Sequence, residues 1–94
     1  MASSYAGAGI PLTLSALARL ALNDATLKGN ARTYASPYLY ALTACESMSD
    51  YYGADSADML ARYALGNLSS WRGESARAWK AEMTARLSST SVSR

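Results

Sequence analysis

Histidine and phenylalanine are absent from this chain of 94 residues, cysteine occurs once and proline twice. Without histidine the chain has no imidazole to serve as a general acid–base or as a metal ligand. Zinc sites need clustered cysteine, histidine or carboxylate ligands, and Cys45 by itself does not supply them. The sequence therefore predicts neither a metal site nor a cofactor.

The single cysteine and the apolar stretches indicate the expected cellular location of the protein. One cysteine excludes an internal disulfide and does not imply an oxidising compartment; we interpret Cys45 as a small buried hydrophobe rather than a reactive thiol. No apolar run approaches the roughly 18 residues of a membrane span. The apolar stretch 10–22 has no positively charged segment before it and contains Arg19, so we do not expect a signal peptide. These features predict a cytoplasmic protein without a membrane partner.

Groups that do chemistry are also scarce. The segment Gly7-Ala8-Gly9 lacks the third glycine and the preceding strand of a dinucleotide-binding loop. Glu46 and Asp50 lie four residues apart, but two solvated acids on a polar face are a better interpretation than a general acid–base pair. We therefore expect no catalytic residues and no enzyme.

β-branched aliphatic residues are the next scarcity, because Ile10 and Val92 are the only isoleucine and valine. Alanine and leucine, which dominate, are strong helix formers, whereas strands favour β-branched residues. The length suits one domain. The sequence predicts an all-α fold, a compact bundle of about four helices over residues 1–94, with flexible tails at 1–9 and 88–94.

Apolar spacing and breaker residues place the helices. We expect them at about 12–28, from Ser36-Pro37 to Gly53, from Asp55 to an open boundary near 69–73, and at 74–87. Serine can cap the second helix and proline fits its first turn, while Gly53 suits its C-terminal end. The predicted core residues are Leu14, Leu17, Ala21, Leu42, Cys45, Leu60, Ala64, Leu68, Trp79, Met83 and Leu87.

What the chain has in abundance is aromatic residues with a polar end: seven tyrosines and two tryptophans. Such side chains suit half-wet surfaces, and five of the tyrosines fall between Tyr34 and Tyr52. Helical spacing over 36–53 gives two stripes. The stripe expected to face inward comprises Tyr38, Leu42, Cys45, Met48, Ser49 and Tyr52, and the outward one comprises Tyr40, Ala44, Ser47 and Tyr51.

The outward stripe is the predicted partner-binding site. Tyr40 and Tyr51 would anchor the partner, and the neighbouring acids Asp50, Asp55 and Asp58 would steer a basic surface toward it. The alternative is that the first helix or the N-terminal arm covers these rings. A third use of the same stripe is a homodimer contact.

Basic residues gather in the C-terminal third and suggest a nucleic-acid site. Arg62, Arg72, Arg77, Lys80 and Arg86 are interleaved with tryptophans on which bases could stack. Two features count against this alternative: Trp79 belongs to the predicted core, and Arg72 and Arg77 point about 140° apart on one helix. A helix-turn-helix is disfavoured because its second helix would begin with acids.

The stretch Asn67 to Met83, which reads NLSSWRGESARAWKAEM, resembles a pattern found in small proteins of phages and plasmids. The resemblance covers under a fifth of the chain and carries no site residues with it. It implies an accessory protein of a mobile element, of which anti-CRISPR inhibitors are compact, cofactor-free examples that occlude a large host complex. The sequence thus predicts a non-enzymatic inhibitor that binds a larger host protein or nucleoprotein complex, with a small DNA- or RNA-binding regulator or a homo-oligomeric subunit as alternatives.

Overall fold

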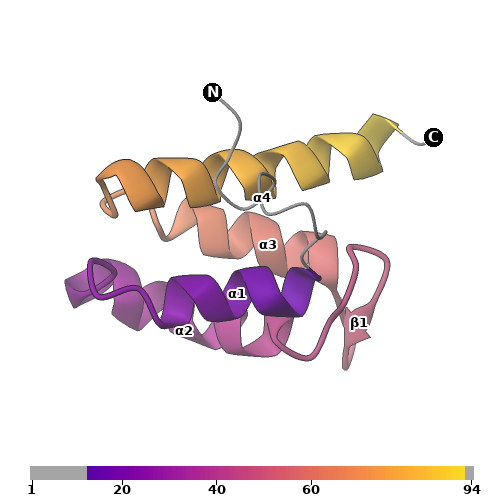
Figure 1. The fold of residues 1–94 in the computed structure, drawn as a ribbon. Coiled ribbons are helices and arrows are strands. Elements are labelled where there is room, and N and C mark those ends of the chain that lie inside the picture. Colours follow the sequence, from indigo (N-terminus) through magenta and orange to yellow (C-terminus); the bar gives the residue numbers. More distant parts are fainter. Residues whose placement is uncertain (1–12, 93–94) are drawn as a thin grey trace.

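The structure, a computed structural model, describes residues 13–92, with side chains for residues 13–88 (Figure 1). This part of the chain is mostly helical and contains one small sheet. The helices are α1 (Leu14–Leu22), α2 (Gly29–Leu42), α3 (Ala57–Gly66) and α4 (Glu74–Val92), and the strands are β1 (Tyr51–Tyr52) and β2 (Asp55–Ser56). The predicted tail 1–9 lies outside the described residues, and α4 continues into the segment 88–94.

Helix α1 is shorter than the predicted 12–28, and local side-chain bonds explain both of its ends. The hydroxyl of Thr13 accepts a hydrogen bond from the backbone N–H of Ala16 at 3.0 Å, which caps the first turn. At the other end the guanidinium of Arg32 donates to the carbonyl of Leu22 at 2.8 Å. A turn built on Asp24 then carries the chain away from the helix axis, because its carboxylate accepts the N–H of Thr26.

Helix α2 begins seven residues before the predicted Ser36, so the expected start is wrong. Gly29, with φ +68°, redirects the chain at the start of the helix. Pro37 therefore lies inside the helix rather than in its first turn. Ser36 does not cap it; its hydroxyl donates to the carbonyl of Arg32, four residues back.

The predicted end of this helix at Gly53 is also wrong, because α2 ends at Leu42 and the chain turns into a hairpin. Strands β1 and β2 pair antiparallel, with Tyr51 opposite Ser56 and Tyr52 opposite Asp55. Gly53 does have a positive φ, +64°, but uses it as the first residue of the two-residue hairpin turn. The predicted cap of the third helix, Asp55, lies in β2, and α3 follows directly at Ala57.

All the residues predicted to form the core are buried, so the apolar spacing identified them correctly. Helix α2 packs against both α1 and α3. Helix α4 is joined to α1 by the indole of Trp79, which donates to the carbonyl of Leu17 at 2.7 Å in the interior. The indole of Trp71 lies beside it, with ring centroids 5.8 Å apart.

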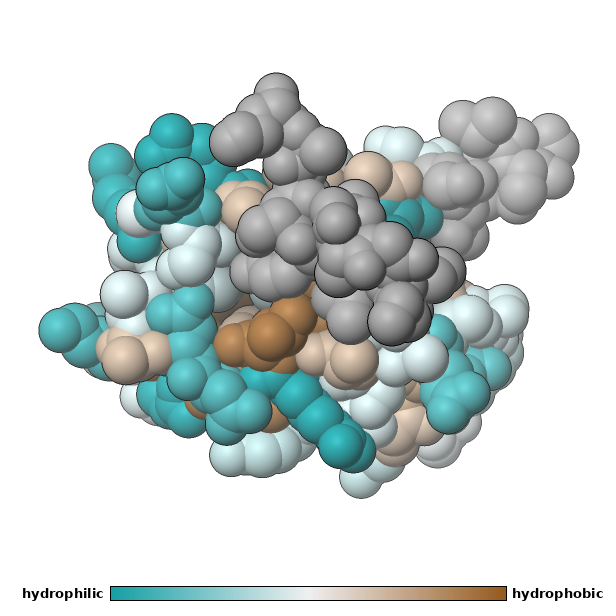
Figure 2. Space-filling view, viewed as in Figure 1, coloured by the Kyte–Doolittle hydropathy of each residue, from teal (hydrophilic) through white to brown (hydrophobic). Residues whose placement is uncertain are grey.

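The arrangement of the elements defines two ends of the molecule. Figure 1 shows the hairpin at one end and the connection between α3 and α4 at the other, next to the loop between α1 and α2. On the face drawn in Figure 2 the surface is mostly hydrophilic, with a small hydrophobic area over α1. Within residues 13–92, none of the helices combines the length and the apolar character needed to cross a membrane.

Candidate functional site

The hairpin exposes two neighbouring tyrosines. The side chain of Tyr51 is 66% exposed and that of Tyr52 is 53% exposed. Successive side chains of a strand point to opposite faces, so exposure of both means that neither face of β1 is covered by the rest of the described chain. The hairpin therefore projects from the helices at its end of the molecule (Figure 1). It offers both tyrosine rings to solvent.

Asp50 fastens this hairpin to the body. Its carboxylate oxygen Oδ2 accepts the backbone N–H of Glu46 at 2.8 Å and that of Ser47 at 3.3 Å. Its carbonyl accepts the N–H of Ala57 at 2.8 Å, which closes the base of the hairpin. The predicted partner-steering acid thus has a structural role in the loop between α2 and β1, through the backbone N–H groups of Glu46 and Ser47.

The other two predicted acids differ in availability. Asp58 is half-buried in the first turn of α3, where its carboxylate accepts the hydroxyl of Ser56. Asp55 is exposed on β2, directly across from Tyr52. Glu46 is exposed as well. The segment 46–58 therefore keeps its acidic character around the two hairpin tyrosines.

The outward stripe is exposed, as predicted, but it is not one stripe. Tyr40, Ala44, Ser47 and Tyr51 are all exposed. Because α2 ends at Leu42, however, Tyr40 lies on a helix and Tyr51 on a strand. For the same reason, the predicted burial of the inward stripe is wrong at its C-terminal end. Leu42, Cys45 and Met48 are buried, whereas Ser49 and Tyr52 are exposed.

Two further tyrosines are exposed on the helices. Tyr34 on α2 is 60% exposed and Tyr63 on α3 is 48% exposed. The ring of Tyr63 meets that of half-buried Tyr38 with centroids 5.4 Å apart. Sequence spacing places Tyr63 with the buried residues of its helix, so only the tyrosine-rich composition indicates that these rings reach solvent.

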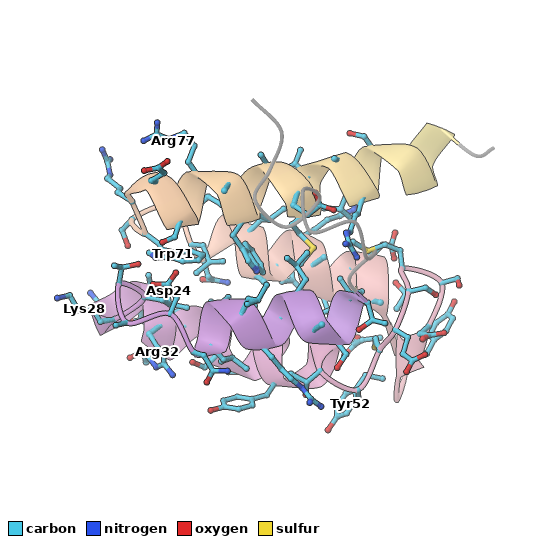
Figure 3. All side chains as sticks on the ribbon, in the orientation of Figure 1. Asp24, Lys28, Arg32, Tyr52, Trp71 and Arg77 are labelled. Atoms are coloured by element: carbon cyan, nitrogen blue, oxygen red, sulfur yellow. The ribbon has the colours of Figure 1, made fainter. Side chains whose placement is uncertain are left out.

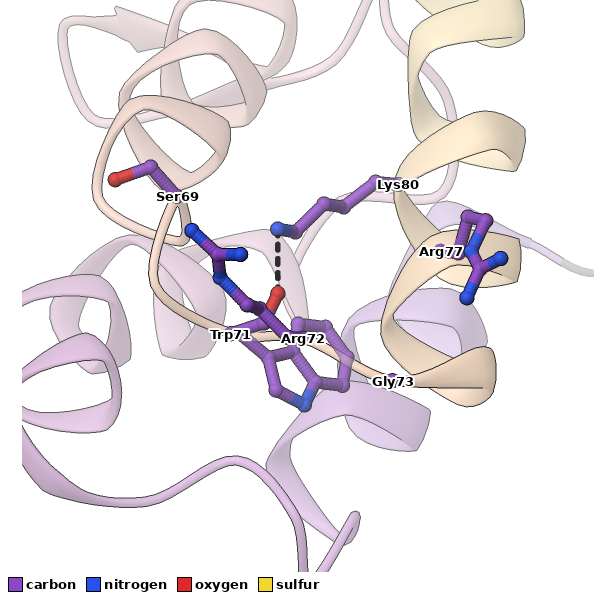
Figure 4. A pocket seen from close by; sticks show the side chains of 6 residues that line it. All are labelled: Ser69, Trp71, Arg72, Gly73, Arg77 and Lys80. Atoms are coloured by element: carbon purple, nitrogen blue, oxygen red, sulfur yellow. Dashed lines mark hydrogen bonds between the residues drawn. The ribbon is translucent and has the colours of Figure 1, made fainter.

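At the opposite end, three of the predicted basic residues surround one pocket. It has a volume of about 370 Å³ and is lined by Ser69, Trp71, Arg72, Gly73, Arg77 and Lys80. Figure 4 shows Arg72 and Lys80 extending toward each other above Trp71, with Arg77 farther away on α4. Figure 3 shows Lys28 and Arg32 at this same end of the molecule.

The angular argument against a shared basic surface is therefore wrong. It assumes one helix through Arg72 and Arg77, but α4 begins at Glu74, and Arg72 lies in the connection that precedes it. Arg77 and Lys80 are three residues apart on α4 and share a side of that helix. The two outer members of the basic set do not join them: Arg62 lies on α3, and Arg86 forms an ion pair with Glu82 at 2.8 Å.

The tryptophans do not offer the stacking surface that the nucleic-acid alternative requires, and Trp79 is in the core as predicted. Trp71 is only 3% exposed and Trp79 is fully buried, so neither offers a ring face to a base. The Nε1–H of Trp71 donates to the hydroxyl of Thr26 at 2.9 Å. That hydroxyl donates in turn to the carboxylate of Asp24, and this bond is the main cause of a lowered Asp24 pKa.

The lining of the pocket contains three cationic side chains and no acid, and Glu74, in the first turn of α4, is the acid next to it in the sequence. Lys80 donates from Nζ to the carbonyl of Trp71 at 2.6 Å. Burial lowers the pKa of Lys80, and the nearby charge of Arg72 lowers this pKa further. In the part of the chain that the structure describes, the guanidinium groups of Arg72 and Arg77 form no ion pair and no hydrogen bond.

The remaining chemical groups do not assemble into a site. The described residues contain no group of three or more acids and cysteines placed to hold a metal ion. Cys45 is fully buried, its Sγ lies 3.8 Å from the carbonyl oxygen of Ala41, and burial raises the pKa of its thiol. Comparisons with models of protein families, with curated proteins and with solved structures find no match.

Proposed function

We propose that the protein is a non-enzymatic binding protein whose hairpin end docks against a basic surface of a larger host protein or nucleoprotein complex. The observation that carries this proposal is the exposure of both Tyr51 and Tyr52 on one two-residue strand. Isolated two-stranded hairpins are only marginally stable. Hydrogen bonds of Asp50 hold this hairpin in place, and its two tyrosine rings stay exposed.

Tyrosine is among the residues that contribute most to binding when a partner buries them, because its ring supplies apolar area and its hydroxyl a hydrogen bond. Charge indicates the kind of partner. Residues 46–58 contain four acids and no base, and Asp55 lies across the strand pair from Tyr52. Such a surface attracts a basic partner and speeds its association, while the rings provide the contact area.

In this proposal the helices act as a compact bundle that carries the hairpin, and the protein works in the cytoplasm. It inhibits its partner by occlusion, as anti-CRISPR proteins of phages do. This part of the proposal depends on the resemblance of residues 67–83 to small mobile-element proteins, and on the scarcity of catalytic groups in the sequence.

Affinity capture with matched variants tests the proposal. Tagged wild-type protein, Y51A/Y52A and the control Y34A are each used to capture proteins from a nuclease-treated bacterial lysate. We expect a polypeptide that the wild type and Y34A retain and that Y51A/Y52A loses, with retention falling as salt is raised. Tyr34 is a fair control because it is 60% exposed and lies on α2, outside the hairpin.

Two results would contradict this assignment. Equal capture by all three proteins would remove the hairpin from the binding site. A wild-type dimer in light scattering that Y51A/Y52A converts to a monomer would make a second copy of the chain the occupant of the hairpin surface. Thermal unfolding of both variants near the wild-type temperature is required, and we expect it because the substituted rings are exposed.

A further inference from the structure

We propose that the pocket between the α3–α4 connection and the first turns of α4 binds a phosphate group, held by Arg72 and Lys80, with Arg77 in its lining. The site lies at the end of the molecule opposite the hairpin (Figure 1). It therefore adds a second binding function and does not depend on the docking proposed above.

The donors suit a phosphate. A guanidinium presents N–H groups in a planar fork that matches two phosphate oxygens, and an ammonium has three donors. Lys80 uses one of its donors on the carbonyl of Trp71 and keeps the others. Arg72 and Arg77 have all of theirs available among the described residues.

The charge balance favours an anion over a neutral ligand. Three cationic side chains line a hollow of about 370 Å³ whose lining contains no acid. The carboxylate of Asp24 is occupied by Thr26 and forms no ion pair with these cations. Burial lowers the pKa of Lys80 most, and repulsion from Arg72 lowers it further; a bound phosphate would offset both effects.

The backbone adds to the same potential. Helix α4 is 19 residues long and begins beside the pocket, with Gly73 in its lining. The start of a helix carries a partial positive charge that attracts phosphates. Gly73 has φ +111°, a conformation that glycine adopts without strain, and this turn directs the chain from Arg72 into α4.

The same geometry limits what is recognised. Because Trp71 and Trp79 are buried, the pocket offers no ring on which a base can stack. We expect it to recognise phosphate oxygens irrespective of base sequence, whether the phosphate belongs to a free ion, a nucleotide or a nucleic-acid backbone.

Titration of charge-matched variants tests the site. Wild type, R72Q/R77Q and the control R19Q/R62Q are titrated with inorganic phosphate and adenosine monophosphate by NMR, and with a labelled random-sequence oligonucleotide by anisotropy at two salt concentrations. Arg19 and Arg62 are exposed and do not line the pocket, so the control removes the same charge from elsewhere. Because all four of these arginines are exposed, both double variants should remain folded.

We expect phosphate to shift the resonances of Gly73, Arg77 and Lys80, and R72Q/R77Q to weaken binding by about tenfold or more while the control stays within about twofold. Binding of the oligonucleotide alone, with the same dependence on Arg72 and Arg77, supports the site and identifies a nucleic-acid backbone as the source. For a single-stranded oligonucleotide, log affinity should then fall by about 0.7 per phosphate contacted for each tenfold rise in salt.

No binding by any of the three probes, or an equal loss in both double variants, overturns the proposal. Neither result affects the capture experiment, whose variants lie on the hairpin.

Discussion

The side chain of Lys80 donates a hydrogen bond to the backbone carbonyl of Trp71 at 2.6 Å. The indole of Trp71 donates to the hydroxyl of Thr26 at 2.9 Å. Trp71 is thus held by α4 through its backbone and by the loop between α1 and α2 through its ring. The connection that carries Arg72 is consequently fixed against α4, and this fixation places Arg72 opposite Lys80 (Figure 4).

Substitution K80M should destabilise the protein, because it removes the donor to a carbonyl in a partly buried position. Loss of one such bond costs about 1–2 kcal/mol of unfolding free energy. Urea unfolding followed by far-UV circular dichroism measures it. The control is R77Q, which removes a charge from the same helix without removing a bond and should stay within about 0.5 kcal/mol of the wild type.

The same variant gives a pH dependence with a defined sign. The pKa of Lys80 is lowered in the folded state, first by burial and then by Arg72. Between the folded and unfolded pKa values the unfolded chain binds more protons, so the contribution of Lys80 to stability rises with pH across that window. The stability difference between wild type and K80M should therefore widen at alkaline pH. A difference that stays constant with pH would contradict this account of Lys80.

Substitution T26V should loosen Trp71 while keeping the shape of residue 26. Valine has no hydroxyl to accept the indole N–H or to donate to Asp24. We expect a loss of about 1–2 kcal/mol in unfolding free energy and a change in tryptophan fluorescence. The control is T33V, whose hydroxyl bonds only to the exposed carbonyl of Gly29. Equal effects of the two substitutions would mean that the Trp71 bond adds nothing to stability.

The core could be predicted from the sequence because burial follows apolar spacing even where helix boundaries do not. Leu68 and Trp71 follow α3 beyond its last residue, Gly66, and both are buried. Cys45 and Met48 are buried in the loop after α2. Large apolar side chains are drawn inside by the loss of their hydrated surface, in a turn as in a helix.

The boundaries of α2 could not be predicted, because local signals were overridden by packing. Residues before Ser36 contribute Ala31 and Ala35 to the core, and burial there favours a helix that begins at Gly29. Ser36, Pro37 and Gly53 are typical of helix ends, but here Ser36 and Pro37 lie inside α2. Gly53 has a left-handed conformation, but it lies in a hairpin turn. Each strand of this hairpin has two residues, which is too short for an alternation of apolar and polar residues to be visible in the sequence.

The candidate sites were predictable in composition and not in geometry. The excess of tyrosine indicates exposed rings, and Tyr40 and Tyr51 are exposed. The sequence did not predict that they lie on different elements, α2 and β1, because it placed the end of the helix at Gly53 instead of Leu42. The basic pocket was not predicted because Arg72 was taken to be helical. Arg72 lies in a connection, so helical spacing does not set the angle between its side chain and that of Arg77.

Cys45 should react with thiol reagents only when the protein unfolds. Its side chain is fully buried, and burial together with the charge of Asp50 raises the pKa of the thiol, so little thiolate forms. Ellman's reagent at neutral pH should therefore label native protein slowly and urea-unfolded protein at once. Rapid labelling of the native protein would show that the loop 43–50 opens or that the thiol is accessible.

Substitution P37A distinguishes the two positions considered for the start of α2. Pro37 is exposed and has no N–H to donate to the carbonyl of Thr33, one turn earlier in the helix. Alanine restores this bond and relieves the clash of the ring with that carbonyl. Alanine also gives the unfolded chain more conformational entropy than proline does, which lowers the stability by about 0.4–1 kcal/mol. An interior proline costs about 3 kcal/mol relative to alanine, so the net expectation is a stabilisation of about 2 kcal/mol.

A helix that began at Ser36 would respond differently to P37A. Proline would then occupy the first turn, where its missing N–H costs nothing, and alanine would leave stability unchanged or lower it slightly. Thermal and urea unfolding of the wild type and P37A separate the two cases by their sign. An independent check is the effect of A35G: at a buried position inside α2 it should cost about 1 kcal/mol or more, because glycine is a poor helix former and the lost methyl group leaves a void in the core. Stabilisation by P37A together with destabilisation by A35G is the pair of results that a helix from Gly29 to Leu42 requires.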